Sequence, residues 1–337
     1  MTALATASSL LLGHEWVVEH VSRALHGGAA AHAYLLTGAP HVGKYTTALA
    51  IARSLLCETG TSCGSCRHCR HVARRIHPDL HTLETPPDRK NIPIKDVHEF
   101  LHGIALKPVE AERAVYVIRG ADHLAEEGAN AFLKTLEEPP PGVTLLLTAP
   151  DAAALLPTIV SRCQLVALHP VPVAPIAAHL VATLGIEPAP AEVIARASEG
   201  RPGWAILAAQ DPELIDERQR RATDLLDLLG ASRLERMQYV DRLAERWSGH
   251  ADEVRGVLEV WMDVWRDTLL VGEGLADRVH NLYVAPRLER AAAAIDAEAV
   301  RSALDATFAI GDALNRNANP RLALEAYALC LPRPGAR

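Results

Sequence analysis

The chain has 337 residues, a length that suggests two or three domains, and 49% of them are hydrophobic, enough to form their cores. Only 4% are aromatic, and we expect mainly helical structure. Its formal net charge of -7 disfavours autonomous DNA binding, because non-specific affinity comes mainly from neutralised phosphates. Its longest apolar stretches, such as Val143–Val160, are broken by Pro150, Asp151 and Pro157, so we expect a cytoplasmic protein without a signal peptide or a membrane span.

The first predicted element is a buried parallel strand at Ala33–Thr37, a short apolar run that leads into a glycine. Residues Tyr45–Leu56 have the spacing of a helix. The loop between them, Gly38–Lys44, matches the pattern G-x-x-x-x-G-K. Strand, glycine loop and helix therefore follow one another in the order that a phosphate-binding loop requires.

This loop carries groups for a phosphate but lacks one for a metal. The backbone N–H groups of Gly38 and Gly43 and the ammonium group of Lys44 are suited to a phosphate. Tyr45 occupies the next position, where Ser or Thr normally binds Mg²⁺. Thr46 is rotated from that position by roughly 100°, so we expect it to face elsewhere. The loop either binds ATP or ADP or is a remnant that binds nothing.

Four cysteines follow the helix in a C-x5-C-x2-C-x2-C pattern: Cys57, Cys63, Cys66 and Cys69. Four thiolates at this spacing suit a closed tetrahedral Zn²⁺ site, and a closed site is structural because catalytic zinc keeps one position open. The alternatives are reduced free thiols, or His68 or His71 in place of one cysteine. The pattern predicts a zinc module at about residues 57–77 in a reducing compartment.

Three further β-rich runs predict strands: Ala114–Ile118, Val143–Thr148 and Leu165–Leu168. A helix is predicted at Leu124–Leu136, and it ends before a triple proline. This alternation indicates an α/β domain with a parallel sheet. In a hydrolysing P-loop ATPase, a strand like the first of these ends in Asp, which helps to hold Mg²⁺. Here that strand runs into Arg119, which cannot bind the metal or act as a base, so we predict that the chain does not hydrolyse ATP.

Ser161, Arg162 and Cys163 precede the last predicted strand, near the edge of the domain. On composition alone, Arg162 is a surface arginine in a salt bridge. Cys163 and Cys330 lie far from the cysteine cluster, and we expect both to be packed.

Prolines at positions 170, 172 and 175 mark a domain boundary. A small helical segment is predicted at Ile176–Leu184 and Ala191–Ala209, separated by a turn at Pro188 and Pro190. After residue 212 the chain reads as nearly continuous amphipathic helix, with Trp247, Trp261 and Trp265 as core or interface anchors.

Together these motifs resemble the clamp-loader subunits of DNA polymerase III, members of the AAA+ family, over essentially the whole chain. Besides the phosphate loop and the cysteine cluster, the motifs that carry the resemblance are Gly13–Glu15, Asn130–Pro140, Ser161–Cys163 and Asn317–Glu325. The resemblance implies a RecA-like AAA+ parallel-sheet domain with a zinc insert (1–169), a small helical lid (170–210) and an all-α collar for oligomerisation (211–337).

Within this family the chain is similar to the delta-prime type, which is catalytically silent. The motor type, gamma or tau, has Asp-Glu where this chain has Arg119, and Asp122 lies past the strand end. Alignment on a Glu-Gly pair places Gly203 where the motor has a sensor arginine, with Arg201 out of register. Another sensor position, Thr148, is retained. The delta type usually lacks the Ser-Arg-Cys motif and the cysteine cluster.

The resemblance implies a stator without ATPase activity of its own, in a hetero-pentamer with gamma/tau and delta subunits of the DNA polymerase III holoenzyme. The assembly loads a sliding clamp on primed DNA at the nucleoid-associated replisome, with no membrane partner. Arg162, flanked by Ser161 and Cys163, would be an arginine finger for a neighbour's ATP site, since its planar guanidinium offers a fork to the γ-phosphate. The alternatives are a divergent gamma/tau-type motor with its own ATPase activity, and a stand-alone nucleic-acid-binding zinc protein.

Overall fold

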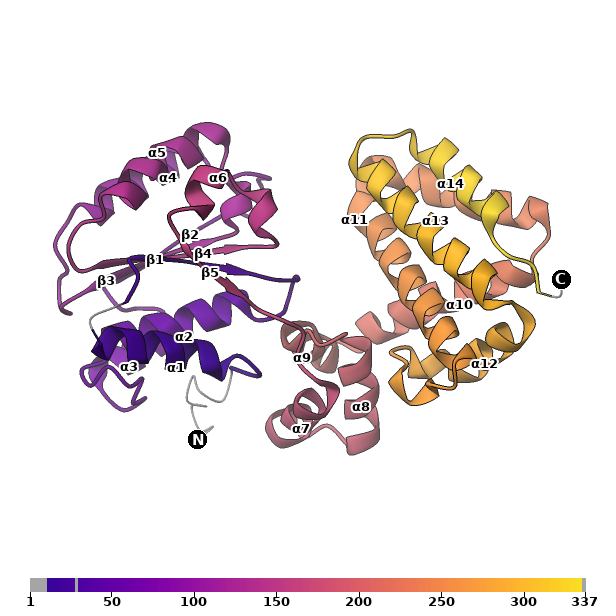
Figure 1. Cartoon of the computed structure of the whole chain (residues 1–337), viewed down its shortest axis with the longest axis horizontal. Coiled ribbons are helices and arrows are strands. Elements are labelled where there is room, and N and C mark those ends of the chain that lie inside the picture. Colours follow the sequence, from indigo (N-terminus) through magenta and orange to yellow (C-terminus); the bar gives the residue numbers. More distant parts are fainter. Residues whose placement is uncertain (1–10, 28–29, 335–337) are drawn as a thin grey trace. The chain divides into compact units, whose positions relative to one another are not determined.

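A computed structural model describes residues 11–27 and 30–334 of the chain (Figure 1). Two compact units are present. The first runs to Ile176 and includes Gly200–Trp204, and the second contains Ala177–Glu199 and the residues from Ala205 onward. The predicted domain ends, residues 1–10 and 335–337, lie outside the described residues. The finer division after residues 169 and 210 stays a prediction.

The first unit is built on a five-stranded sheet with the order β2-β3-β4-β1-β5, in which every pair of neighbouring strands is parallel. Its strands are β1 Ala33–Thr37, β2 Leu80–Glu84, β3 Ala114–Arg119, β4 Val143–Ala149 and β5 Gln164–Ala167. Its helices are α1 Glu15–His26, α2 Lys44–Leu56, α3 Arg67–Ala73, α4 Ile94–Ile104, α5 Glu126–Glu137 and α6 Pro157–Val160. The predicted α/β class with a parallel sheet is confirmed, and all four predicted strands are present.

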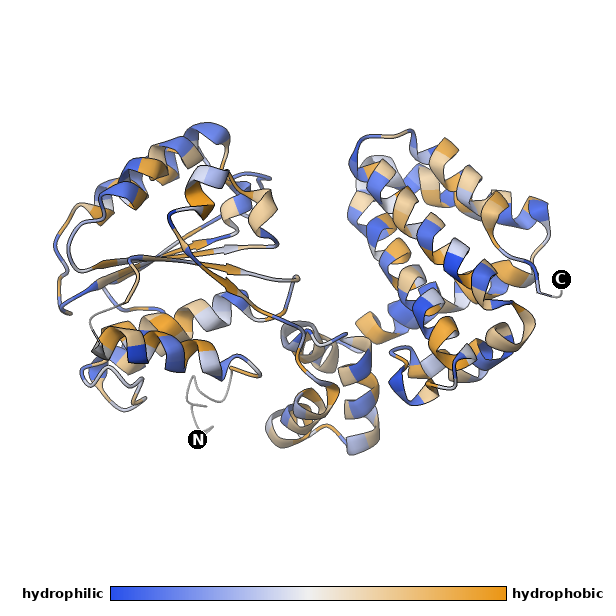
Figure 2. Ribbon diagram, viewed as in Figure 1, coloured by the Kyte–Doolittle hydropathy of each residue, from blue (hydrophilic) through white to orange (hydrophobic). Residues whose placement is uncertain are grey.

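Helices cover both faces of this sheet, with α4 to α6 on one side and α1 to α3 on the other (Figure 1). Successive strand residues point to opposite faces. Leu35 therefore packs in one apolar cluster and Leu36 in the other. Because both faces are buried, the central strands are hydrophobic over nearly their whole length (Figure 2). The edge strand β2 escaped prediction because among its residues only Leu83 is buried.

The second unit is helical in its described residues, as predicted. Its helices are α7 Val173–Leu184, α8 Pro188–Ala197, α9 Pro202–Gln210, α10 Glu213–Gly230, α11 Arg233–Gly272, α12 Ala285–Ala294, α13 Ala297–Asn315 and α14 Pro320–Cys330. The first residues of α7, up to Ile176, and of α9, up to Trp204, belong to the first unit. The long helix α11 starts at a capping box formed by Ser232 and Glu235 and is kinked at His250. Asn319 caps α14 by accepting a hydrogen bond from the Leu322 N–H group, which gives the Asn317–Glu325 motif a structural role.

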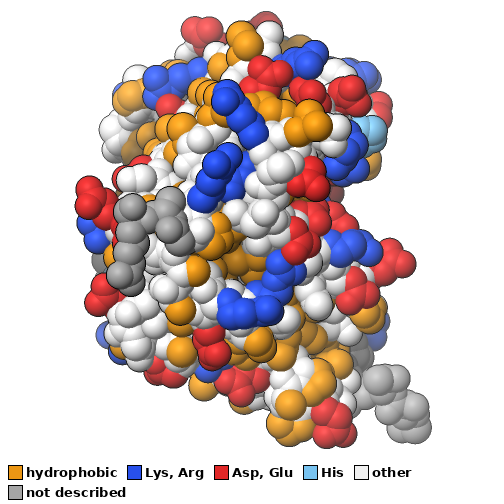
Figure 3. All heavy atoms as spheres, turned by 90° about the vertical axis from the view of Figure 1, so that its right-hand side faces the viewer, with side chains coloured by type: hydrophobic (Ala, Val, Ile, Leu, Met, Phe, Trp, Pro, Cys, Tyr) orange, Lys and Arg blue, Asp and Glu red, His pale blue; other side chains and the backbone are white. Residues whose placement is uncertain are grey.

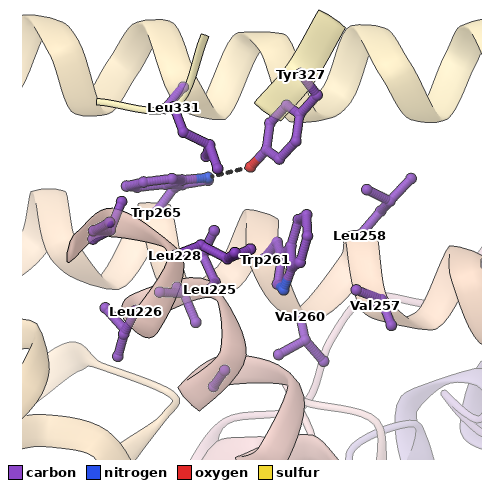
Figure 4. Packing of buried hydrophobic residues seen from close by; sticks show 14 of the residues in the cluster. Leu225, Leu226, Leu228, Val257, Leu258, Val260, Trp261, Trp265, Tyr327 and Leu331 are labelled. Carbon is purple, nitrogen blue, oxygen red and sulfur yellow. Dashed lines mark hydrogen bonds between the residues drawn. The ribbon is translucent and has the colours of Figure 1, made fainter. Parts of the chain in front are cut away.

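Two aromatic side chains of α11 form the centre of this unit (Figure 4). Trp261 and Trp265 are fully buried, and the indole N–H of Trp265 donates to the hydroxyl of Tyr327 on α14 at 3.0 Å. The rings of Trp261 and Tyr327 stack with their centroids 5.4 Å apart. Trp247 is partly buried against the same cluster. Trp261 and Trp265 therefore tie the long helix α11 to α14 through one aromatic core.

The predicted turn at Pro188 and Pro190 is wrong. Both prolines lie in the first turn of α8, where proline is tolerated because its nitrogen needs no intrahelical partner. The break between α7 and α8 falls earlier, at residues 185–187. A second break falls at Glu199 and Gly200, whose φ angles of 53° and 76° are left-handed. The segment predicted as one helix, Ala191–Ala209, is therefore split between α8 and α9.

A buried ionic network holds α8, α10 and α11 together within the second unit. The Arg218 guanidinium donates to the carboxylates of Asp263 and Glu199, the latter at 2.6 Å. His280 lies 3.6 Å from the same Asp263 carboxylate. Burial by itself raises the pKa of Asp263, but the neighbouring His280 and the Arg218 charge lower it to about 2. Asp263 is therefore ionised at neutral pH and forms a buried ion pair with Arg218.

We expect Arg218→Met to lower the free energy of unfolding of the second unit by about 3–5 kcal/mol, because it leaves the Asp263 carboxylate buried without its counter-charge. Urea unfolding followed by circular dichroism measures the loss. Arg220→Met is the matched control, since Arg220 lies on the same helix in an exposed pair with Glu217 and should matter little. In the parent chain, the contribution of ionised Asp263 is complete above its unfolded pKa of 3.8 and declines as the pH falls toward about 2. Equal stability of the two variants would contradict this.

None of the helices in the described ranges combines the length and the apolar character needed to cross a bilayer. On the face drawn in Figure 3, Lys and Arg side chains lie among acidic and hydrophobic ones, so this face is not uniformly basic.

Candidate functional site

The phosphate loop has the backbone conformation that its two glycines predict. Gly38 follows β1 with a φ of 144°, and a Cβ atom there would lie 2.6 Å from the Leu168 carbonyl oxygen. Gly43 caps the start of α2 with a φ of 109°. Both positions favour glycine, because other residues are strained at these φ angles. The loop therefore turns sharply from the strand into the helix N-terminus.

A cavity of about 660 Å³ opens above this loop. Four of the predicted nucleotide-binding residues line it: Gly43, Lys44, Thr46 and Thr148. Gly38 is not among the lining residues, and its N–H group donates to the Pro150 carbonyl at 3.1 Å. Both Tyr45 and Thr46, on the first turn of α2, line the cavity, and the expectation that Thr46 faces away from the metal position stays a prediction.

The Lys44 ammonium is folded onto the loop. Its Nζ atom donates to the carbonyl oxygens of Gly38 at 2.6 Å and Ala39 at 2.8 Å. Burial lowers the pKa of Lys44, while the charge of Asp122 acts in the opposite direction. Burial and the positive charges of Arg201, Lys44 and Arg119 lower the pKa of the neighbouring His41. Positive charge is therefore concentrated at this end of the cavity.

An arginine lies beside the position where a metal ion would be expected. Arg119, the last residue of β3, lines the cavity and places its guanidinium carbon 5.1 Å from the centre of the Tyr45 ring. Its Nη1 atom lies 2.9 Å from the Glu84 carboxylate, and residues 84 and 119 are paired in register across β2 and β3. Arg75 lies over the same ring at 5.3 Å. The sequence did not indicate Glu84 as a lining residue, because β2 was not predicted.

Two backbone contacts limit what else the cavity can hold. The Thr148 hydroxyl accepts a hydrogen bond from the Gly120 N–H group at 3.0 Å, so the retained sensor threonine braces the end of β3. Gly203 donates its N–H group to the His41 carbonyl at 2.9 Å. A Cβ atom at Gly203 would also lie 2.9 Å from that oxygen, so the position predicted for a sensor arginine cannot accept a side chain without a shift.

The four predicted zinc ligands are brought together. The sulfur atoms of Cys57, Cys63, Cys66 and Cys69 all lie within 4.8 Å of one another. Tetrahedral zinc with Zn–S bonds of about 2.3 Å requires sulfur separations of about 3.8 Å, close to the 4.0 Å between Cys63 and Cys69. The geometry therefore fits a Zn²⁺ ion held by four thiolates.

Backbone N–H groups support these sulfurs. The N–H groups of Cys63, Cys66 and Cys69 each donate, at 3.4 Å, to the sulfur of the preceding cysteine of the set. Burial by itself raises the pKa of Cys57, but hydrogen bonds from Thr59 and Cys63 lower it to about 5, which favours a thiolate. His68 instead lies 2.7 Å from a ring nitrogen of His77. The alternative with His68 is therefore weaker than the four-cysteine set.

Arg162 follows α6 and makes three hydrogen bonds within its own chain. Its guanidinium pairs with Glu137 at 2.6 Å and donates to the Thr158 carbonyl at 2.9 Å and to the Ser161 hydroxyl at 3.3 Å. The Arg162 side chain is 34% exposed and the Glu137 side chain 52% exposed. The pair therefore leaves part of the guanidinium accessible to another molecule.

The two distant cysteines differ from each other. Cys163 is half-buried, and burial raises the pKa of its thiol to about 11. Cys330 is exposed near the end of α14, so the prediction that it is packed is wrong. Its helix turns that side chain outward, while Tyr327 and Ala328 face the core.

Residues 13–172 match the family described as DNA polymerase III, delta subunit. DNA polymerase III subunit tau of Escherichia coli is 34% identical over 198 residues, 56% of this chain and 30% of that protein. Subunit delta' of Bacillus subtilis is 35% identical over 141 residues, 41% of this chain and 42% of that protein. Subunit delta' of Pseudomonas aeruginosa is 37% identical over 142 residues, 41% of this chain and 43% of that protein.

The chain spans less than half the length of these curated relatives. Among solved structures, a DNA polymerase III gamma subunit-related protein of Thermotoga maritima is 18% identical to this chain, with a TM-score of 0.44. The match covers 96% of this chain and 98% of that protein's chain. Relatives of both the tau and the delta' type match, so the relatives alone do not decide between them.

Proposed function

We propose that this chain, whose residues 13–172 match the DNA polymerase III delta-subunit family, is a delta-prime-type clamp-loader subunit, a largely non-hydrolysing stator in the loading of a sliding clamp during DNA replication. The observation that carries this proposal is Arg119, which lies at the end of β3 beside Tyr45, where a motor needs a carboxylate and a hydroxyl for Mg²⁺. The close contact of Gly203 with His41 supports it, because it leaves no room for a sensor arginine.

Arg162 is proposed as an arginine finger in trans, flanked by Ser161 and Cys163. Its partial exposure and its position after α6 support this role, and the ion pair with Glu137 holds the guanidinium in one orientation. On binding, a γ-phosphate of the neighbour would replace or share this carboxylate partner. An exposed ion pair contributes little to stability, so the exchange costs little.

The proposed assembly is a hetero-pentamer with gamma/tau and delta subunits that acts on a sliding clamp and primed DNA, as part of the DNA polymerase III holoenzyme in the nucleoid-associated replisome. Residues 57–77 would form its structural zinc module, residues 170–210 a lid and residues 211–337 the collar. The phosphate loop would bind ATP or ADP without turnover through Gly43, Lys44, Thr46 and Thr148, with Gly38 forming the turn that leads into it.

Co-expression tests the assembly. We expect this chain, tagged, to co-purify with a gamma/tau-like and a delta-like subunit encoded in the same genome, as one complex in size-exclusion chromatography. The tagged chain expressed with the delta-like subunit alone is the control, since a motor subunit is expected to lie between them. A chain that remains alone with both partners present would contradict the proposal.

The second candidate is a divergent gamma/tau-type motor, favoured by the intact G-x-x-x-x-G-K loop and by the match to tau. ATP turnover separates the two. We expect the purified chain to show no hydrolysis above background, because Arg119 offers neither a metal ligand nor a base and Tyr45 offers no Mg²⁺ ligand. Steady turnover that Lys44→Ala abolishes would identify a motor. Under the stator proposal, Lys44→Ala weakens nucleotide binding and leaves assembly nearly unchanged.

A further inference from the structure

We propose that the phosphate-loop cavity binds a nucleoside di- or triphosphate without a divalent cation, with the Arg119 guanidinium in the place of the metal. This inference rests on the nucleotide-binding part of the proposed function. It adds the source of the positive charge and predicts a site that is insensitive to removal of Mg²⁺.

Arg119 is positioned by two contacts on the wall of the cavity. Its guanidinium lies over the Tyr45 ring at 5.1 Å, and Tyr45 directly follows Lys44 on the first turn of α2. Its Nη1 atom is 2.9 Å from Glu84 at the end of the neighbouring strand. Stacking on an aromatic face suits a planar guanidinium, because the N–H donors that do not bind Glu84 can then reach a ligand in the plane of the group. The same residue pair, Tyr45 and Arg119, replaces both protein groups that would hold Mg²⁺.

The charges that face the cavity favour a polyphosphate over a metal ion. Two permanent cations line it, Lys44 and Arg119, and their charges offset those of the two lining carboxylates, so the side chains carry no net negative charge to attract a divalent cation. The lining carboxylates are Glu84 and Asp122. Arg119 and Glu84 are 56% and 54% exposed, so their ion pair is weak in water and a phosphate can replace the carboxylate. Arginine binds phosphate oxygens through two parallel hydrogen bonds, and these bonds form without a metal ion.

The size of the cavity favours a nucleotide over a single phosphate. At about 660 Å³ it lies within the range of small-molecule sites and is far larger than one phosphate group. Its lining runs from the phosphate loop through Arg119 to Pro150 and Gly203, and this leaves room for a nucleoside beyond the phosphates.

The opposing interpretation assigns Glu84 and Asp122 as replacement Mg²⁺ ligands. The two interpretations make opposite predictions for nucleotide binding. If Glu84 is a metal ligand, binding requires both Mg²⁺ and Glu84. If Glu84 competes with phosphate for Arg119, binding does not need Mg²⁺ and Glu84 weakens it. Both interpretations can be tested on the full-length chain by equilibrium binding of ATP, ADP and inorganic pyrophosphate, each with Mg²⁺ or with EDTA.

We expect the Kd for ATP to change by no more than about threefold on going from Mg²⁺ to EDTA. Arg119→Ala should raise Kd by about tenfold or more in both buffers, the effect of losing charge-assisted hydrogen bonds to a phosphate. Arg75→Ala is the matched control, because Arg75 contacts the same Tyr45 ring without lining the cavity, and it should leave Kd within about twofold. Thermal melts establish that each variant is folded.

Glu84→Gln keeps the test decisive if Arg119→Ala does not fold. Removal of the competing carboxylate should tighten ATP binding about two- to fivefold with or without Mg²⁺. Binding that EDTA abolishes, or that Glu84→Gln weakens only in Mg²⁺, would overturn the proposal in favour of a metal site. No binding of any probe would also overturn it, while co-purification with the other subunits would still support the delta-prime role. Pyrophosphate that binds as tightly as ATP would overturn the nucleoside assignment.

Discussion

Arg162→Ala should lower the clamp- and DNA-stimulated ATPase rate of the assembled loader while the isolated subunit folds and melts like the parent. A trans arginine finger contributes roughly 10³–10⁵ in rate at a single site in GTPase systems. The total rate should fall only in part, because other sites of the complex keep their fingers. Clamp loading should fall further if the sites must act together. The measurement is steady-state ATP hydrolysis by the reconstituted complex with this one subunit changed.

Two variants distinguish a finger from a structural ion pair. Arg162→Lys should fail to restore the rate, because lysine keeps the charge but loses the planar fork. Glu137→Gln removes the ion pair and leaves the guanidinium in place, so the ATPase rate should be kept or raised. If the 2.6 Å pair is the whole role of Arg162, both Arg162→Ala and Glu137→Gln would leave the rate unchanged. Arg23→Ala on α1 is the control for loss of an arginine from the same unit.

One tightly bound zinc per chain is the second large effect we expect. Zinc held by thiolates in small peptides contributes about 10–16 kcal/mol of binding free energy, so its loss should at least melt residues 57–77. Elemental analysis of protein purified under reducing conditions without chelator should give about one zinc per chain. Cys66→Ser should lower this value sharply, because it removes one of the four proposed ligands and the sulfur that caps α3 by accepting from the Cys69 N–H group.

Cys330→Ser is the matched control for zinc, since Cys330 is exposed and distant in sequence from the cluster and its loss should leave the metal content unchanged. A zinc content near zero in the parent protein would refute the metal site. A normal content in Cys66→Ser would point to another ligand, and His68 and His71 would then be the residues to change next.

Much of the first unit could be predicted because its signals are local. The strand at Ala33–Thr37 was predicted with its true ends, since a strand buried on both faces is a continuous apolar run. The phosphate loop and the four cysteines were equally visible, because each depends on the spacing of a few residues in one segment. The edge strand β2 was missed for the opposite reason, because only one of its five residues, Leu83, is buried and the strand has no apolar run.

The sequence alone thus determined the α/β and helical parts of the chain, the cradle for a phosphate and the set of four thiols. Only the tertiary structure decided what surrounds them. The pairing of β2 with β3 brings Glu84 to Arg119, and the return of α6 past α5 brings Arg162 to Glu137. Each of these contacts joins residues at least 25 positions apart. Such pairs depend on sheet register and on the packing of helices, which no short pattern of residues specifies.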